Sequence, residues 1–384
     1  SYIIKLIYRQ RLGEDVTSEL IKCVCEYYDC MRHYKLSEAN LHFLRYIAKE
    51  AGIPQYYYML EQFDKRICVN NVDMGTLSLL IHESTLHTIE DVMLHRYQRE
   101  VLDQFRTNSS NRFFLSASTS FGKTFLVYEI IRKMQYCNVF LIFPTLALLS
   151  ENIMKIYSEK CYAWIKEKYK IHTLSDVTEV ADCNLYIYTP ERFLSFNDKH
   201  PNAQIDFFFV DEAYKLDNEF IVNEEQKENE RDVAYRLALQ LGLKENTTDA
   251  LLAGPYIDFS RPENQDYNPS FDFFCKDNNI KVLDYNKIEI VNKTRLQITT
   301  AKTIIVPGED QFSFTFTKTK KNEKMAELVK YLVQRGEQVI IYGSTKSRVQ
   351  TYATLLCSVL PDIDLSLEHD FISHINGMFK GRGS

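Results

Sequence analysis

Hydrophobic residues recur along this chain with two different periods, and the change of period divides the sequence into regions. In residues 1–92, apolar positions fall three and four apart, as they do on one face of an α-helix. The clearest predicted helices each begin at a serine suited to cap a helix N-terminus, and they span Ser18–Tyr34 and Ser37–Ala51. Gly52-Ile-Pro54 then ends the helical pattern. We expect a helical region without chemistry of its own, suited to docking a partner protein.

Between residues 93 and 317, short apolar runs alternate with helical patterns. The predicted strands are Phe113–Ser116, Val139–Phe143, Asn184–Tyr188, Phe207–Val210 and Ala250–Ala253. The predicted helices are His95–Arg106, Lys123–Met134, Ala147–Tyr169 and Asp232–Leu241. Such alternation predicts an α/β domain with a parallel sheet and right-handed crossovers. We interpret two later β-rich runs, Lys287–Val291 and Phe312–Phe316, as the last strand of this sheet and a connector.

Residues 318–384 show the beginning of a second alternating pattern. A predicted helix, Glu323–Arg335, leads to a predicted strand, Gln338–Tyr342, and to a further helix, Lys346–Val359. The chain begins with serine rather than methionine and ends in Lys380-Gly-Arg-Gly-Ser384. We therefore expect a piece of a longer protein, in which a second α/β domain begins but is incomplete.

The stretch Ala117-Ser-Thr-Ser-Phe-Gly-Lys-Thr124 has the composition of a phosphate-binding loop. It follows an apolar strand and precedes a helical pattern, which is the context that such a loop requires. Backbone N–H groups surround the phosphates, Lys123 reaches the β- and γ-phosphates, and the Thr124 hydroxyl ligates Mg²⁺. The residues expected to bind the nucleotide here are Ser118, Thr119, Ser120, Phe121, Gly122, Lys123 and Thr124. Ala117 stands where the general pattern has glycine, so an ordinary turn between strand and helix is the alternative.

A second motif, Phe207-Phe-Phe-Val-Asp-Glu-Ala-Tyr214, is an apolar strand that ends in two carboxylates. The carboxyl ends of parallel strands form the edge at which α/β proteins bind ligands. We expect Asp211 to hold Mg²⁺ and Glu212 to act with Lys123 in catalysis by polarising the attacking water. A solvated Asp-Glu pair is common after a strand, but strands between the two motifs leave room for a RecA-like sheet.

Composition narrows the class of protein. The 384 residues are 45% hydrophobic and 26% charged, which is typical of a globular protein. No apolar run approaches the roughly 18–20 residues of a membrane span, and no signal peptide is visible, so we expect a cytoplasmic protein without a membrane segment. Nine cysteines without metal-ligand spacing are interpreted as reduced thiols.

The net charge of −6 argues against a protein that coats nucleic acid by bulk charge. It does not argue against a motor whose contacts lie in one groove. The charge is uneven, with an acidic stretch at Asp217–Asp232 and a basic one at Lys318–Arg335. Each is interpreted as a solvated face, and the basic stretch is equally suited to line a groove.

The order and spacing of the motifs resemble those of superfamily 2 helicases of the DExD/H-box type, over residues 95–360. Ala117–Thr124 is similar to motif I of that family, with Ser120 where the family usually has glycine, and Asp211-Glu-Ala-Tyr214 is similar to motif II. Gln98 is similar to the family's adenine-reading glutamine, whose amide pairs with a donor and an acceptor of the base. The resemblance implies a RecA-like P-loop NTPase domain with ATP and Mg²⁺ as cofactors.

Three further stretches resemble family motifs that contact nucleic acid or open the second RecA-like domain. Phe143-Pro-Thr-Leu146 is similar to motif Ia, Tyr188-Thr-Pro-Glu-Arg192 to motif Ib, and Val339–Arg348 to motif IV. Helix N-terminal amides, threonine hydroxyls and arginine contact phosphate without reading bases. The residues expected to contact nucleic acid are Pro144, Thr145, Thr189, Pro190, Arg192, Ser344 and Lys346.

The chain also departs from the family pattern. Tyr214 stands where the family most often has His or Asp, and Leu252-Ala-Gly-Pro255 stands where Ser-Ala-Thr is usual. The loop sequence Thr119-Ser-Phe-Gly-Lys-Thr124 and the pair Gly254-Pro255 resemble those of the Ski2-like branch of the family. They are also similar to those of bacterial anti-phage defence helicases such as the Hachiman helicase subunit. No stretch resembles motifs V and VI. Motif VI supplies arginine fingers in the family, so we expect the chain alone to bind nucleotide but to hydrolyse it slowly.

These observations predict an ATP-dependent helicase or translocase of single-stranded or partly duplex DNA or RNA, acting in bacterial defence against phage or foreign DNA. A nucleotide-binding regulatory or scaffold subunit is an alternative, which would dock an effector such as a nuclease through residues 1–92. The altered motifs II and III favour that alternative. A P-loop ATPase that acts on no nucleic acid is a third hypothesis, against which the turns at Pro144 and Pro190 argue.

Overall fold

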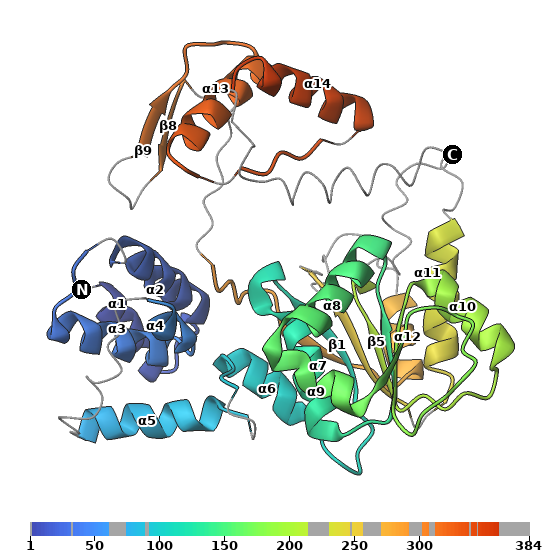
Figure 1. The fold of residues 1–384 in the computed structure, drawn as a ribbon. Helices are drawn as coiled ribbons and strands as arrows, with labels where there is room; N and C mark the ends of the chain where they lie inside the picture. Colours follow the sequence, from blue (N-terminus) through green and yellow to red (C-terminus); the bar gives the residue numbers. More distant parts are fainter. Residues whose placement is uncertain are drawn as a thin grey trace. The chain divides into compact units, whose positions relative to one another are not determined.

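The protein divides into two compact units, Ser1–Asn292 and Lys293–Ser384 (Figure 1). The computed structural model describes residues 2–31, 34–60, 74–88, 92–213, 230–245, 248–255, 270–291, 302–306, 312–337, 339–343 and 345–360. No helix among these residues is long and apolar enough to cross a membrane.

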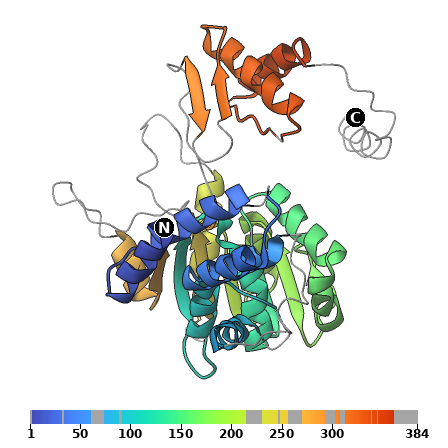
Figure 2. The same ribbon diagram turned by 90° about the vertical axis from the view of Figure 1, so that its left-hand side faces the viewer.

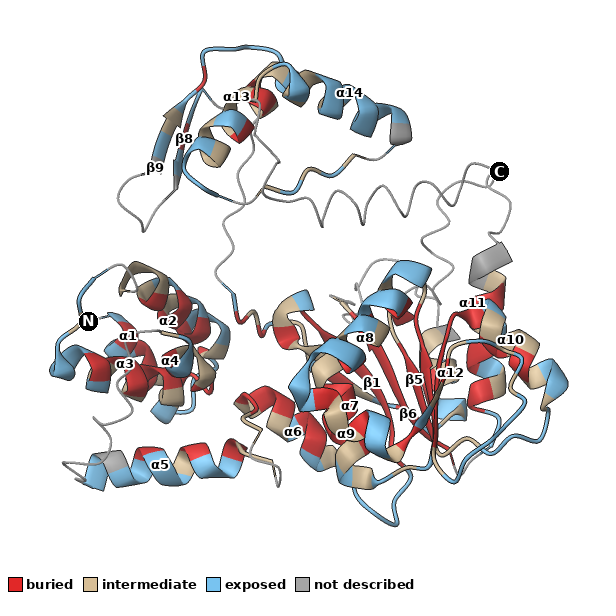
Figure 3. Ribbon diagram, in the orientation of Figure 1, coloured by how far each residue is buried: buried red, intermediate tan, exposed pale blue. Residues whose placement is uncertain are grey.

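A seven-stranded sheet in the order β3-β4-β2-β5-β6-β1-β7 forms the centre of the first unit, and all its described strand pairs are parallel. The strands are β1 (Arg112–Ala117), β2 (Asn138–Ile142), β3 (Lys170–His172), β4 (Asn184–Tyr188), β5 (Phe207–Val210), β6 (Asp249–Gly254) and β7 (Lys281–Tyr285). A parallel sheet is covered on both faces, so its inner strands are mostly apolar. Every residue of β1, β4, β5 and β6 is buried (Figure 3).

Alternate residues of the strands face opposite sides of the sheet and enter two separate cores. Phe207 and Phe209 belong to one core and Phe208 to the other. The helices that share the first core are α6 (Arg96–Gln104), α7 (Lys123–Met134), α8 (Leu146–Ser158) and α9 (Ala163–Lys168). The helices that share the second core are α10 (Pro190–Lys199), α11 (Glu230–Gly242) and α12 (Ser270–Asp277). The predicted RecA-like α/β arrangement is therefore confirmed.

Helices form the described part of the N-terminal region, as predicted. They are α1 (Tyr2–Arg11), α2 (Thr17–Met31), α3 (Glu38–Glu50), α4 (Gln55–Met59) and α5 (Met74–Leu86). The predicted serine cap of α3 is confirmed, because Ser37 Oγ accepts the Asn40 N–H at 3.3 Å. Apolar residues of α1 to α4 lie in the same core as the first face of the sheet, so the helical region packs onto the domain that carries the phosphate loop.

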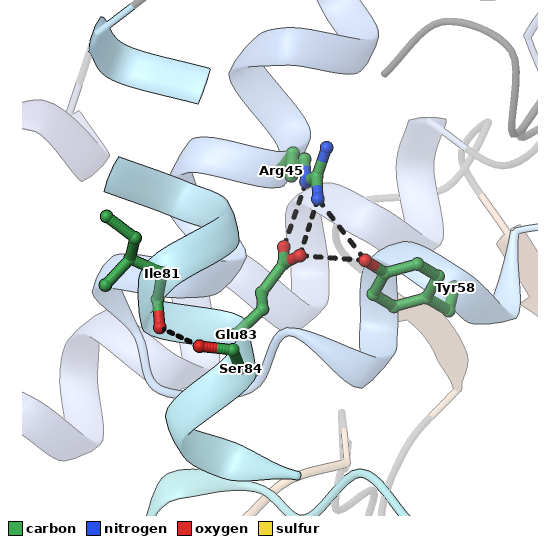
Figure 4. A network of polar contacts seen from close by, with 5 residues as sticks. All are labelled: Arg45, Tyr58, Ile81, Glu83 and Ser84. Atoms are coloured by element: carbon green, nitrogen blue, oxygen red, sulfur yellow. Dashed lines mark hydrogen bonds and ion pairs between the residues drawn. The ribbon is translucent and has the colours of Figure 1, made fainter. Parts of the chain in front are cut away.

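A buried ion pair joins α3 to α5 (Figure 4). Arg45 Nε donates to Glu83 Oε1 at 2.9 Å, and the Tyr58 hydroxyl donates to Glu83 Oε2 at 2.8 Å. The side chains of Arg45 and Glu83 are only 4% and 5% exposed. Removal of either charge would leave the other buried without a partner, which is strongly destabilising. The two charges therefore have to stay together, and this keeps α5 against α3.

Two predicted elements of the first unit differ from the observed ones. The predicted helix Ala147–Tyr169 is interrupted, because the backbone at Glu159 is extended and a short 3₁₀ turn, η3 (Lys160–Tyr162), separates α8 from α9. The prediction that Lys287–Val291 is the last strand of the sheet is wrong, because that strand is β7. The register, in which Phe113 lies opposite Lys281, depends on contact with β1, which periodicity does not report.

In the second unit, an antiparallel pair of strands lies beside two helices (Figure 2). The elements are β8 (Thr303–Val306), β9 (Phe312–Thr315), α13 (Lys321–Gln334) and α14 (Lys346–Cys357). Both predicted helices are confirmed, whereas residues 339–342 of the predicted strand Gln338–Tyr342 form no strand. Ile340 is 97% exposed and Tyr342 is 88% exposed, so this apolar stretch has no sheet beside it within the described residues. A second RecA-like domain, and the domain limits at residues 92 and 317, stay predictions.

Candidate functional site

The predicted phosphate loop joins β1 to α7 at the carboxyl edge of the sheet. Thr119–Phe121 form a short 3₁₀ turn, η2, and Gly122 then takes a left-handed conformation with φ of 75°. Glycine adopts this backbone without steric cost. A Cβ at Gly122 would lie 2.7 Å from the side-chain nitrogen of Gln98. The glycine therefore permits both the tight entry into α7 and the close approach of Gln98.

Lys123 is the first residue of α7, and its ammonium lies against the loop. Its Nζ donates to the carbonyl oxygens of Ala117 at 3.0 Å and Ser118 at 2.8 Å. The side chains of Lys123 and Thr124 are both half-buried. A positive charge and a hydroxyl thus stand at the N-terminus of a 12-residue helix, where the helix dipole favours an anion.

The carbonyl of Phe121 ties this loop to the start of α6. It accepts one hydrogen bond from Gln98 Nε2 at 2.9 Å and lies 3.1 Å from His95 Nε2. The N–H of Gln98 donates to His95 Nδ1 at 3.0 Å, so the neutral ring carries its proton on Nε2 and donates it to Phe121. The Phe121 ring is fully buried and packs edge-on against the His95 ring. The loop is therefore held by its own backbone as well as by its side chains.

Gln98 has protein partners at both ends of its amide. Its Oε1 accepts the His95 N–H at 3.3 Å, which completes a capping box, and its Nε2 donates to Phe121. The residue is buried, with 6% of its surface exposed. One amide N–H and part of the oxygen's acceptor capacity remain for a base, so adenine pairing by Gln98 stays a prediction.

Burial of His95 makes stability depend on pH. Desolvation lowers the pKa of His95 from 6.5 to about 4. Between these values the unfolded chain binds the extra proton and the folded protein does not, so the free energy of unfolding decreases as the pH falls. We expect a loss of up to about 3 kcal/mol between pH 6.5 and pH 4 from this residue. Urea unfolding at several pH values measures it.

The control for this prediction is His95→Asn, which keeps a helix-capping side chain but does not titrate. The stability of the variant should depend less steeply on pH than that of the parent protein. Parallel pH profiles for the two proteins would contradict the assignment.

Asp211 and Glu212 follow β5 at the same edge of the sheet. The N–H of Asp211 donates to the Ile142 carbonyl at 3.0 Å, and the Tyr235 hydroxyl donates to the Asp211 carbonyl. Glu212 has a φ of 52°, a left-handed conformation that a non-glycine residue seldom adopts and that costs on the order of 1–3 kcal/mol. Its N–H donates to Asp211 Oδ1 at 3.0 Å. The fold thus maintains a strained turn where the sequence predicts two functional carboxylates.

Strand order brings the loop and the acidic pair to one place. β6 lies between β1 and β5, so the two motifs emerge two strand spacings apart, about 10 Å. This separation suits a nucleotide triphosphate with its metal ion. Thr124 and Asp211 carry the kinds of oxygen, hydroxyl and carboxylate, that Mg²⁺ prefers and would hold it together with the nucleotide, so this metal site stays a prediction. Gly254 ends β6 between the two motifs, so no hydroxyl side chain stands there.

The two turns predicted to hold nucleic acid lie next to each other beyond β2 and β4. Thr145 Oγ1 accepts the Leu148 N–H at 3.3 Å and begins α8, while Thr189 Oγ1 accepts the Arg192 N–H at 3.4 Å and begins α10. The Phe143 N–H donates to the Tyr188 carbonyl at 2.9 Å, which extends the pairing of the two strands to these turns. Two threonine-capped helix N-termini therefore stand side by side.

The side chains of these turns differ in exposure. Thr189 and Pro190 are buried, whereas Pro144, Thr145 and Arg192 are half-buried. Arg192 Nη1 donates to the Thr173 carbonyl at 2.8 Å, which ties this residue of α10 to the segment after β3. Nucleic-acid contact by any of them stays a prediction.

Some predicted positions fall outside what the structure describes. Tyr214 and Ser344 lie outside the described residues, and so does the side chain of Lys346. Thr345 caps α14 in the second unit, where its Oγ1 accepts the Arg348 N–H at 3.3 Å. Among the described residues, no cluster of three or more His, Cys, Asp or Glu side chains forms a metal site independent of nucleotide.

Sequence reasoning missed two features of the site. One is the anchoring of Phe121 by His95, for which the His95-x-x-Gln98 spacing was a faint signal, because a capping box uses this spacing but usually begins with Ser or Thr. The other is the segment after β7, where the Ile288 carbonyl accepts the Ser118 hydroxyl at 3.0 Å. No local sequence pattern reports that contact.

Comparison with known proteins agrees with this geometry. Residues 95–238 match the family model described as DEAD/DEAH box helicase. The chain is also similar to anti-bacteriophage protein B of Escherichia coli strain K12, with 28% identity over 171 residues. The similar part covers 44% of this chain and 22% of that protein, so the chain spans less than a quarter of its relative. The resemblance to DExD/H-box helicases is thereby confirmed for the domain that contains both motifs.

Proposed function

We propose that this chain, which contains a DEAD/DEAH box helicase domain at residues 95–238, is part of an ATP-dependent motor that moves along nucleic acid. The observation that carries the proposal is the shared edge of the sheet. There the phosphate loop, the acidic pair and two neighbouring helix N-termini open in the same direction. The phosphate loop and the acidic pair suit a nucleoside triphosphate, and the two helix N-termini suit a row of nucleic-acid backbone phosphates.

In this proposal, each site residue has a distinct task. Lys123 and the amides of Ser118–Gly122 hold the β- and γ-phosphates, and Thr124 and Asp211 hold Mg²⁺. The metal ion, when bound, neutralises the charge that develops on the phosphates. Glu212 takes a proton from the attacking water. Residues of the turns before α8 and α10 hold single-stranded nucleic acid, so hydrolysis can be coupled to movement.

The resemblance to anti-bacteriophage protein B extends the proposal to a pathway. We assign the motor to bacterial defence against phage or foreign DNA, where it acts in the cytoplasm. A helical region at residues 1–92 is suited to dock an effector protein. These assignments rest on the distant relative and on the helical surface, rather than on the nucleotide site.

Measured ATP hydrolysis with and without nucleic acid tests the motor proposal. We expect single-stranded DNA or RNA to raise the ATPase rate about tenfold or more, since bound nucleic acid completes the active arrangement in a motor of this class. Duplex of the same length and added salt are the controls, because phosphate contacts weaken as salt rises.

A specific observation favours a second candidate function. The end of β6 carries Gly254 and Pro255 between the phosphate loop and the acidic pair, where the family usually has hydroxyl residues. A nucleotide-binding scaffold that docks an effector would not need them. If ATP binds but no nucleic acid changes its hydrolysis, this second function replaces the first.

A further inference from the structure

Two separate routes of hydrogen bonds lead from the phosphate loop to the same turn of the N-terminal region. That turn is Ala51–Tyr57, which follows α3 and includes the first residues of α4. Each route begins on a residue of the loop itself, Phe121 in one case and Ser118 in the other. Two routes that converge on one turn hold the loop from two sides.

The first route runs through the start of α6. His95 and Gln98 hold the Phe121 carbonyl, as described above. The next residue after His95, Arg96, donates its backbone N–H to the Gly52 carbonyl at 2.9 Å. The Tyr97 hydroxyl donates to the Ala51 carbonyl at 3.1 Å. The first turn of α6 therefore contacts the phosphate loop on one side and the N-terminal turn on the other.

The second route runs through the segment Asn286–Ile290, which we call the strap. The Ser116 hydroxyl donates to Asn286 Oδ1 at 2.7 Å, and the Ser118 hydroxyl donates to the Ile288 carbonyl at 3.0 Å. Two residues further on, the Ile290 carbonyl accepts the Tyr56 hydroxyl. The side chains of Ile288 and Ile290 are buried, with 6% and 5% exposed, so the strap is held along its length.

Gly52 shows that the N-terminal turn is fitted closely to α6. Its φ is 75°, and a Cβ there would lie 3.0 Å from the Cβ of Arg96. Glycine is needed for both reasons, since other residues strain at positive φ and have no room beside Arg96. By contrast, Gly13 has a φ of 91° with nothing within 4 Å of a Cβ.

We infer that docking of the N-terminal helical region positions the phosphate loop, so that docking and nucleotide binding strengthen each other. A phosphate loop binds well only when its amides are already aimed at the phosphates, and both routes fix backbone that carries those amides. Coupling between two sites is reciprocal, so nucleotide must stabilise the docked helices by the same factor. The inference rests on the proposed nucleotide site and makes the N-terminal region a regulator of its affinity.

Substitutions at the N-terminal turn test this inference far from the nucleotide. Tyr56→Phe removes the hydroxyl that holds the strap, and Gly52→Ala disturbs the contact with Arg96. Their matched controls are Tyr46→Phe, whose hydroxyl meets only Arg11 at the surface in the described contacts, and Gly13→Ala, which has similar backbone strain but open space. Calorimetry with the non-hydrolysable analogue adenylyl imidodiphosphate and Mg²⁺ gives the dissociation constants.

We expect Tyr56→Phe and Gly52→Ala to weaken binding of the analogue about fivefold or more, and the controls to leave it within twofold. Hydrogen exchange of the α2–α4 amides is the second readout. The analogue should slow that exchange in the parent protein, and should slow it less in the two test variants. A merely structural role would lower stability without this ligand-dependent protection.

The outcomes separate this inference from the proposed site. If Lys123→Ala abolishes binding while Tyr56→Phe and Gly52→Ala bind like their controls, the coupling is refuted and the site stands. If Lys123→Ala binds normally, the nucleotide site itself is misplaced. If Gly52→Ala fails to fold, the milder Tyr56→Phe decides, because its loss is confined to one hydroxyl.

Discussion

Replacing Lys123 with alanine is expected to remove measurable binding of ATP with Mg²⁺. The ammonium supplies charge-assisted hydrogen bonds to the β- and γ-phosphates, which are the strong kind, so affinity should fall by about 100-fold or more. Calorimetric titration with the non-hydrolysable analogue measures the loss without interference from turnover. The thermal unfolding midpoint should change little, because the lysine is only half-buried and its hydrogen bonds to the Ala117 and Ser118 carbonyls lie within one loop.

The matched control is Lys155→Ala on α8. Lys155 forms an exposed ion pair with Glu151 at 2.6 Å, and such pairs contribute little to stability. The control protein should bind the nucleotide like the parent. Unchanged affinity in Lys123→Ala would show that the loop after β1 does not hold the phosphates.

Replacing Glu212 with glutamine is expected to stop hydrolysis while leaving ATP binding intact. The amide has nearly the shape of the carboxylate but cannot accept the proton of the attacking water, and loss of a general base typically costs about 10²–10⁴-fold in rate. Steady-state ATPase measured with nucleic acid present gives the change in kcat. A separate titration gives the affinity, which should remain within about twofold of the parent value because the phosphate contacts are untouched.

Glu151→Gln is the control for this second change, because it removes an exposed carboxylate from α8. It should hydrolyse ATP at the parent rate. If Glu212→Gln also retained that rate, the strained turn after β5 would have a purely structural origin, and another residue would have to activate water.

The pattern of apolar residues alone determined the core of the nucleotide domain. Five predicted strands are confirmed, because buried parallel strands are continuous apolar runs whose ends are marked by small or charged residues. The passage from strand to helix at Ala117–Thr124 was also predicted correctly from its glycine, lysine and threonine spacing, while its binding of phosphate stays a prediction. Both features depend on residues that are close together in the chain, so the local sequence is sufficient to predict them.

Contacts between distant segments were decided only by the tertiary structure. Strand β7 could not be told from the neighbouring run at Lys287–Val291, because an edge strand is chosen by what pairs with it and both runs are partly apolar. The break at Glu159 was hidden for a similar reason, since α8 and α9 continue the same helical periodicity on either side of it.

The anchors of the phosphate loop show the same limit at the site. The Phe121 carbonyl and the Ser118 hydroxyl are bound by His95 and by Ile288, which lie 26 and 170 residues away in the chain. A backbone carbonyl accepts hydrogen bonds whatever side chain it bears, so the sequence does not mark it as an anchor. Sequence therefore predicted which residues are expected to carry the chemistry, and the fold determined what holds them in place, because hydrogen bonds from side chains to remote backbone carbonyls leave no periodic pattern in the sequence.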